Sequence, residues 1–125
     1  MFYTCKTESI VMTNFRTLRV YQDAMDLVVH VYDYTADLPL DERFNLKAQL
    51  RRCAVSIPSN IAEGCGRHTR ASLALFVSNA IGSAYEVDTQ LMIAKRVGYP
   101  DCDELIAHTT RVEKQLVAFH KRLQQ

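Results

Sequence analysis

The sequence contains little glycine and proline, with four and three among its 125 residues. Tight turns depend on these two residue types, so a protein built from many short strands and turns is disfavoured. No internal repeat and no low-complexity run is present either. At this length we expect one domain around a single core, made of long helices with few connections.

The sequence also lacks an apolar run of membrane-spanning length and the basic-then-apolar order of a secretion signal. No two cysteines form a Cys-x-x-Cys pair, and two of the four fall on an apolar helical face. We therefore expect reduced, buried thiols in a cytoplasmic protein with no membrane partner. The four cysteines are Cys5, Cys53, Cys65 and Cys102.

The first eleven residues have no helical period, and Met12 directly precedes the patterned part of the chain. We expect a disordered or irregular extension over residues 1–14 and one domain over residues 15–125, with Met12 as the natural start. No stretch alternates with period two for long enough to predict a strand.

Features of an enzyme or a metal site are sparse. No glutamate has a histidine three residues later, which argues against the di-metal carboxylate centres that four-helix bundles often carry. Cys65-x-x-His68 is only half of a zinc site, and Gly64-Cys65-Gly66-Arg67 follows a helix where a phosphate loop would follow a strand. Ser56, Ser59 and Ser83 have no histidine nearby in sequence, although sequence distance does not exclude a catalytic base that is close in space. We expect no enzyme, no cofactor and no metal.

Apolar residues recur at alternating spacings of four and three over residues 18–36, 42–64, 70–97 and from about 103 to 123. This periodicity predicts four amphipathic helices, hence an all-α, antiparallel up-down-up-down four-helix bundle. Pro58 predicts a kink or a break with restart inside the second helix, and Gly64 and Gly66 should end that helix. The expected N-terminal caps are Asp41, Thr69, and Asp101 or Asp103.

The formal charge is only +1, but the positive charge is local. Residues 1–46 carry four basic and seven acidic groups, whereas residues 47–70 carry five and one. A cluster of this kind can bind phosphate backbones. The candidate nucleic-acid-binding residues are Lys47, Arg51, Arg52, Arg67 and Arg70.

Polar residues also line up on the second and third predicted helices. Such a stripe is either a solvated face or a buried polar network between helices or subunits, because small residues interleave with the charged ones. Glu63 would pair with Arg52 or Arg67 in such a network. The candidate network residues are Ser56, Asn60, Glu63, Ser83 and Glu86.

One string is long and unusual: Arg51-Arg52-x-Ala54-Val55-Ser56-Ile57-Pro58-Ser59-Asn60-Ile61-Ala62-Glu63-Gly64-x-Gly66-Arg67, followed by Phe76, Gly82-Ser83-x-x-Glu86 and Gln90-Leu91. It resembles the four-helix bundle proteins encoded in intervening sequences of bacterial 23S ribosomal RNA genes, over about residues 15–123. The resemblance implies a small cytosolic bundle that assembles as a homopentamer. It also implies kinship with the accessory protein of diversity-generating retroelements, a basic pentameric bundle that binds nucleic acid and a reverse transcriptase.

Two functions follow as expectations. The first is a non-enzymatic homo-oligomeric bundle that binds nucleic acid, namely structured RNA, through the basic cluster on the second helix. The alternative is a protein-interaction scaffold with no nucleic-acid partner. In both cases the protein associates with further copies of itself.

Overall fold

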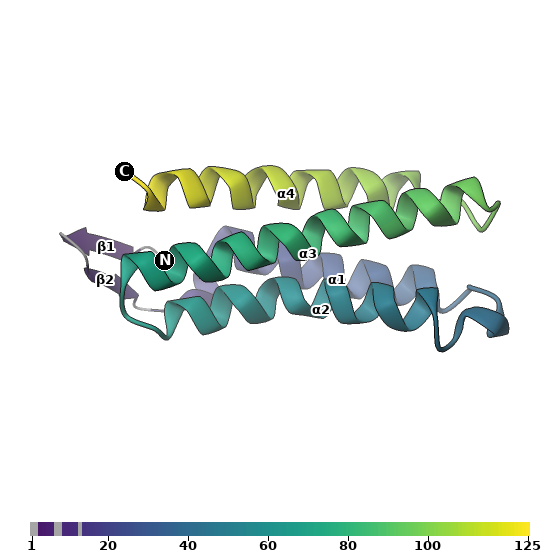
Figure 1. Ribbon diagram of the computed structural model, residues 1–125, viewed down its shortest axis with the longest axis horizontal. Helices are drawn as coiled ribbons and strands as arrows, with labels where there is room; N and C mark the ends of the chain where they lie inside the picture. Colours follow the sequence, from purple (N-terminus) through teal and green to yellow (C-terminus); the bar gives the residue numbers. More distant parts are fainter. Residues whose placement is uncertain (1–2, 7–8, 13) are drawn as a thin grey trace.

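The computed structural model describes residues 3–6, 9–12 and 14–125, with side chains described from residue 14 onward. These residues form four long helices, which run in alternating directions along the bundle (Figure 1). Each helix packs against its neighbours in chain order, and the last packs against the first. The predicted all-α up-down-up-down bundle is confirmed. The helices are α1 (Arg19–Thr35), α2 (Leu46–Cys65), α3 (Arg70–Arg96) and α4 (Asp103–Leu123).

The core is made of the apolar residues that the spacing of four and three placed on one face of each helix. Leu27, Leu50, Val87 and Leu116 come from the four different helices, and none of them is exposed. Burying a side chain of this size contributes about 1.5–3 kcal/mol relative to leaving it in water. The hydrophobic core therefore supplies the main stabilisation and holds the helices in their antiparallel order.

The N-terminal segment differs from the expectation that the chain has no strand. Strand β1 (Tyr3–Lys6) pairs antiparallel with β2 (Ser9–Met12), with Tyr3 opposite Met12 and Lys6 opposite Ser9. Each strand has only four residues, too few for a period-two pattern to stand out, although aromatic and β-branched residues of this segment favour strands. The hairpin lies beyond the end of the bundle where the C terminus also lies (Figure 1). The status of Met12 as a start stays a prediction.

Pro58 lies inside α2 without ending it, so the break with restart that we considered does not occur. Its missing N–H and its ring disturb the hydrogen bonds of the preceding turn. Two side chains add hydrogen bonds to that turn: Ser59 Oγ donates to the Val55 carbonyl at 2.8 Å, and Asn60 Nδ2 donates to the Ser56 carbonyl at 2.8 Å. These bonds go to the carbonyls of Val55 and Ser56, whereas the carbonyl that lacks its helical N–H partner because of Pro58 is that of Ala54. The helix continues through Pro58 because Ile57, Pro58 and Ile61 are buried in the core.

The helix ends follow local hydrogen bonding. The Thr69 hydroxyl accepts from the Ser72 backbone N–H at 3.1 Å, which confirms the predicted cap of α3. Asp101 Oδ1 accepts from the Asp103 N–H at 3.1 Å, so Asp101 serves the start of α4. The predicted cap at Asp41 is wrong. Residues Leu40–Glu42 form a 3₁₀ turn, and Glu42 Oε1 accepts from the Leu46 N–H at 3.3 Å.

Gly64 lies within the last turn of α2 and is buried, so the prediction that it ends the helix is wrong. A Cβ at this position would lie 2.7 Å from the Phe76 Cβ and 2.9 Å from the Leu73 Cδ1. The absence of a side chain at Gly64 therefore allows α2 and α3 to approach closely there. Gly66 follows the helix as its C-cap, as predicted.

Candidate nucleic-acid interface

One end of the bundle is strongly basic. Here α1 and α3 begin and α2 and α4 end (Figure 1). Residues 14–22, 61–75 and 116–125, which form this end, contain six lysines and arginines and one acidic side chain, that of Glu63. The opposite end, formed by residues 31–51 and 89–104, has five cations and seven carboxylates. The basic end consists of Arg16, Arg19, Arg67, Arg70, Lys121 and Arg122.

Arg19 in the first turn of α1 and Arg122 in the last turn of α4 lie at the same groove of this end. Both are exposed, and both line one shallow groove between the two helices. The Arg122 guanidinium lies 5.6 Å from the centre of the Phe119 ring, which supports its side chain without neutralising its charge. Among the residues that the structure describes, Arg19 has no hydrogen bond or ion pair. Both guanidinium groups are therefore available to an external anion.

Arg67 lies on the turn between α2 and α3. Its Nη2 is 3.0 Å from Glu63 Oε2, and the guanidinium lies 5.0 Å from the centre of the Phe76 ring. Both members of the ion pair are more than half exposed. An exposed pair contributes at most about 1 kcal/mol, so Arg67 can exchange Glu63 for a phosphate at little cost.

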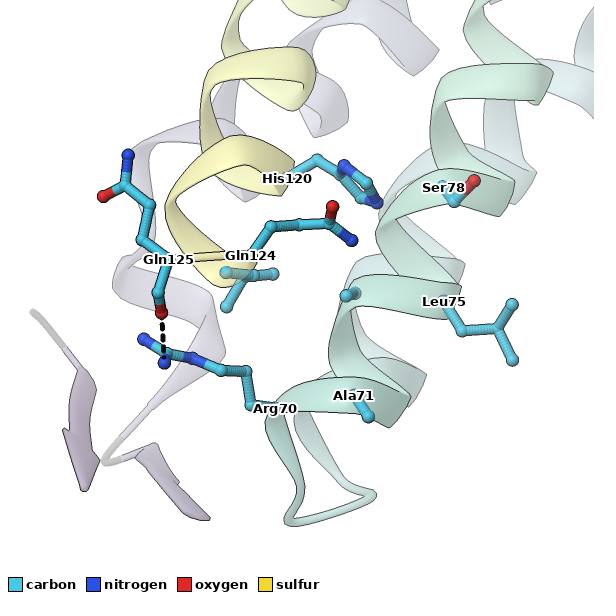
Figure 2. A pocket seen from close by; sticks show the side chains of 9 residues that line it. Arg70, Ala71, Leu75, Ser78, His120, Gln124 and Gln125 are labelled. Carbon is cyan, nitrogen blue, oxygen red and sulfur yellow. Dashed lines mark hydrogen bonds between the residues drawn. The ribbon is translucent and has the colours of Figure 1, made fainter. Parts of the chain in front are cut away.

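Arg70 is one of the residues that line a cleft between α3 and α4 at the same end (Figure 2). Its Nη1 donates to the Gln125 main-chain oxygen at 2.7 Å. Its Nε is buried and has no hydrogen-bond partner among the described residues. The cleft has a volume of about 660 Å³, and we call it the terminal cleft. Its polar lining residues are Arg70, Ser78, His120, Gln124 and Gln125.

The five cations predicted from the sequence do not form one patch. Residues 47 and 65 are about 27 Å apart along α2, at 1.5 Å per residue, and Arg67 lies beyond the end of that helix. Only Arg67 and Arg70 belong to the basic end. Lys47 and Arg52 lie further along α2, and neither makes a hydrogen bond or ion pair within the part of the chain that the structure describes.

Arg51 on α2 contacts Tyr32 and Thr35 on α1 and so links the two helices. Its Nε donates to Thr35 Oγ1 at 2.8 Å and its Nη2 to the Tyr32 carbonyl at 3.3 Å. The guanidinium also lies 4.4 Å from the centre of the Tyr32 ring. Thr35 is fully buried, and its hydroxyl donates in turn to the Val31 carbonyl at 2.8 Å. These contacts use two of the five N–H donors of Arg51 and fix its guanidinium against α1.

Four residues of the basic end were missed by sequence reasoning: Arg16, Arg19, Lys121 and Arg122. They are distant in sequence from residues 47–70, and charge counted by segment hides them because acidic residues elsewhere in their segments balance them. The signal that would have found them is topology. In an antiparallel bundle the start of the first helix and the end of the fourth meet the turn between the second and third.

The predicted polar network is present in part, between α2 and α3. Ser56 Oγ lies 2.8 Å from Ser83 Oγ, and Asn60 Nδ2 donates to Ser56 Oγ at 2.9 Å. All three side chains are half-buried. These contacts are within one chain, so the polar stripe joins two helices of the same bundle here.

Glu86 and Glu63 lie outside that cluster. Gln90 Nε2 is 3.4 Å from both Glu86 Oε2 and Gln49 Oε1, which makes a second, weaker polar cluster. Glu63 pairs with Arg67, one of the two partners expected for it. The five predicted network residues are thus divided among two clusters and the basic end.

Cys65 and His68, the half of a zinc site in the sequence, differ in their surroundings. Cys65 is buried, and burial raises the pKa of its thiol to about 11, so the metal-binding thiolate is disfavoured. His68 is exposed and has the left-handed backbone conformation, with φ of 67°. Within the described ranges no three potential metal ligands cluster.

No helix among the described residues is sufficiently long and apolar to cross a membrane. No curated protein matches the chain. A solved structure from Bacteroides thetaiotaomicron VPI-5482, titled as a protein with unknown function from the S23 ribosomal protein family, is similar to it with a TM-score of 0.74 and 22% identity. The match covers 82% of this chain and 95% of that one, and shows that the fold is shared. Residues 16–118 match the family model described as the 23S rRNA-intervening sequence protein, and the chain belongs to that family.

Proposed function

We propose that the protein is a non-enzymatic, homo-oligomeric bundle that binds nucleic acid, namely structured RNA, through the basic end. The observation that carries this proposal is the concentration of six cationic side chains and one acidic side chain at one end of a chain with a net charge of only +1. This surface replaces the patch on the second helix that the sequence suggested. The buried thiols of Cys53, Cys65 and Cys102, none of them in a disulfide, support a cytoplasmic location.

Binding at this end would be electrostatic. Each lysine or arginine that neutralises a phosphate releases a counterion, so affinity falls steeply as salt rises. Six cations on one bundle give modest affinity. In a cyclic oligomer each copy presents the same end, and several modest sites on one ligand bind far more tightly than one.

Self-association is the second part of the proposal, and we place a second copy of the chain on the outer face of α1 and α2. Met25 and Val55 are each about 40% exposed there and line an apolar groove that Pro58 and Ala62 share. Apolar surface of this kind on a small protein marks an interaction site. The homopentamer stays part of this proposal.

A protein-interaction scaffold without a nucleic-acid partner is the second candidate function. The same apolar groove favours it, because a groove of this composition fits a protein surface and not a polyanion. In that case the protein would form oligomers and bind a partner protein but would not bind RNA.

Two measurements separate these functions. Fluorescence anisotropy with a labelled RNA hairpin at low ionic strength should show binding that high salt abolishes. If the protein binds no RNA even at low salt, the nucleic-acid function is wrong and the scaffold remains. Light scattering should give a mass several times 14.3 kDa. The double variant M25E/V55E should reduce that mass, whereas V97E, at an exposed apolar residue of another face, should not.

A further inference from the structure

We propose that the terminal cleft accepts one unpaired nucleotide of the bound RNA. This inference rests on the proposed function and names the feature of RNA that the basic end selects. It concerns the cleft between the start of α3 and the end of α4, shown in Figure 2.

The size of the cleft suits a nucleotide. Its volume of about 660 Å³ lies within the range of small-molecule sites, about 300–1,000 Å³. The apolar part of its lining consists of Ala71, Ala74, Leu75 and Leu123, of which Ala74 and Leu123 are buried. A single phosphate or metal ion would leave most of this space and its apolar surface unused.

The side chains at the cleft match the parts of a nucleotide. The His120 ring points from α4 toward α3, near Ser78, and offers a flat surface on which a base can stack (Figure 2). The Gln124 amide lies next to it in the same view and carries both a donor and an acceptor, as the polar edge of a base requires. Arg70 provides positive charge at the same cleft.

The surroundings of the cleft favour a nucleotide that is part of a chain over a free one. Arg67 lies three residues before Arg70, and Lys121 directly follows His120, whereas Arg122 lies in the groove between α1 and α4. An RNA strand that continues from the cleft along the basic end would therefore meet further cations, whereas a free nucleotide would use few of them. A base within a duplex cannot enter, because both of its faces are stacked and its edge is paired.

The test compares an RNA duplex with the same duplex carrying one unpaired adenosine, by fluorescence anisotropy at low salt. Wild-type protein should bind the RNA with the unpaired base about tenfold more tightly, the effect of one base stacked on an aromatic ring. His120→Asn should remove this preference and leave the affinity for the plain duplex unchanged.

The matched control is His68→Asn, which removes an exposed histidine of the same end that does not line the cleft. Asparagine tolerates the left-handed backbone at residue 68, so the control should fold and keep the full preference. Free adenosine monophosphate at the same concentration should compete poorly.

The outcomes separate the inference from the proposed function. If wild-type protein binds both RNAs equally and in a salt-dependent manner, the cleft does not take a base while the basic end still binds RNA. The inference is also overturned if His120→Asn keeps the preference, or if free adenosine monophosphate competes as well as the RNA. If neither RNA binds, the proposed function and the inference both fail.

Discussion

His30 on α1 and His108 on α4 face each other, with their Nδ1 atoms 3.0 Å apart. At this distance one nitrogen must carry a proton and the other must accept it, so the pair tolerates one shared proton but not two. Burial, followed by the charges of His30 and Arg111, lowers the pKa of His108 below its ordinary value of 6.5. Asp23 and Asp26 oppose that shift without cancelling it.

This pair makes the bundle sensitive to acid. Because the pKa of His108 is lower in the folded state than in the unfolded state, the unfolded chain binds more protons once the pH falls below about 6.5. The contribution to stability is complete above that pH and is lost as the pH decreases toward the folded pKa. Replacing His108 with asparagine should therefore destabilise the protein less at pH 5.5 than at pH 7.5, as measured by denaturant unfolding. An equal effect at both pH values would contradict the assignment.

Glu113 on α4 has the opposite dependence. Burial raises the pKa of its carboxyl to about 8, and the neighbouring Asp88 carboxylate adds to the rise. The folded protein thus binds a proton that the unfolded chain has released, and stability decreases as the pH rises from about 4.5 to about 8. Glu113→Gln, which resembles the protonated acid, should raise the melting temperature at pH 8.5 and have little effect near pH 4.5. Glu104→Gln, an exposed carboxylate of the same helix, is the control and should show no such difference.

Two glycines should respond in opposite directions to alanine. At Gly64 the new methyl group would be 2.7 Å from the Phe76 Cβ, so α2 and α3 must move apart. This change should lower the free energy of unfolding by about 1–3 kcal/mol. At Gly82, in the middle of α3, a Cβ meets nothing within 4 Å. Alanine there should stabilise the helix by up to about 1 kcal/mol. Urea unfolding of the two variants checks both signs, and a stabilising Gly64→Ala would show that α2 and α3 are not in tight contact there.

Arg51 should matter for stability and not for RNA. Removing it leaves the buried Thr35 hydroxyl without its donor and exposes the Tyr32 ring, which should cost about 1–3 kcal/mol. Arg51→Gln should therefore lower the melting temperature while RNA affinity changes only by the loss of one distant charge. The neighbouring Arg52→Gln removes an exposed cation with no hydrogen bond among the described residues, and should leave the melting temperature unchanged. Equal melting temperatures for the two variants would refute the structural role of Arg51.

The four-helix bundle could be predicted from the sequence because the pattern that indicates each helix lies within that helix. The spacing of Leu50 and Ile57, or of Leu116 and Leu123, is a local property, and so is the cap at Thr69. The helix through Pro58 was harder, because whether a proline breaks a helix depends on how the residues around it, such as Ile57 and Ile61, pack against the other helices. Gly64 was misassigned because its role depends on Phe76, which lies on another helix.

The candidate site was less predictable than the fold. The local excess of positive charge predicted that Lys47, Arg51 and Arg52 bind nucleic acid. The position of a side chain also depends on the neighbouring helix, however, and Arg51 donates a hydrogen bond to Thr35 of α1. The basic end combines three segments that meet only when the helices pack antiparallel. The family string from Arg51 to Arg67 thus identifies the fold, while most of the cations proposed to bind RNA lie outside it.

The salt dependence of RNA binding tests the basic end most directly, in wild-type protein and in two double variants that each remove two positive charges. R19Q/R122Q alters the basic end, and K47Q/R52Q alters the patch suggested by the sequence. For R19Q/R122Q the negative slope of log affinity against log salt should become shallower by about one for each arginine removed from a phosphate contact. K47Q/R52Q should keep the wild-type slope. A reduced slope in K47Q/R52Q, with R19Q/R122Q unchanged, would contradict the assignment of the RNA surface to the basic end.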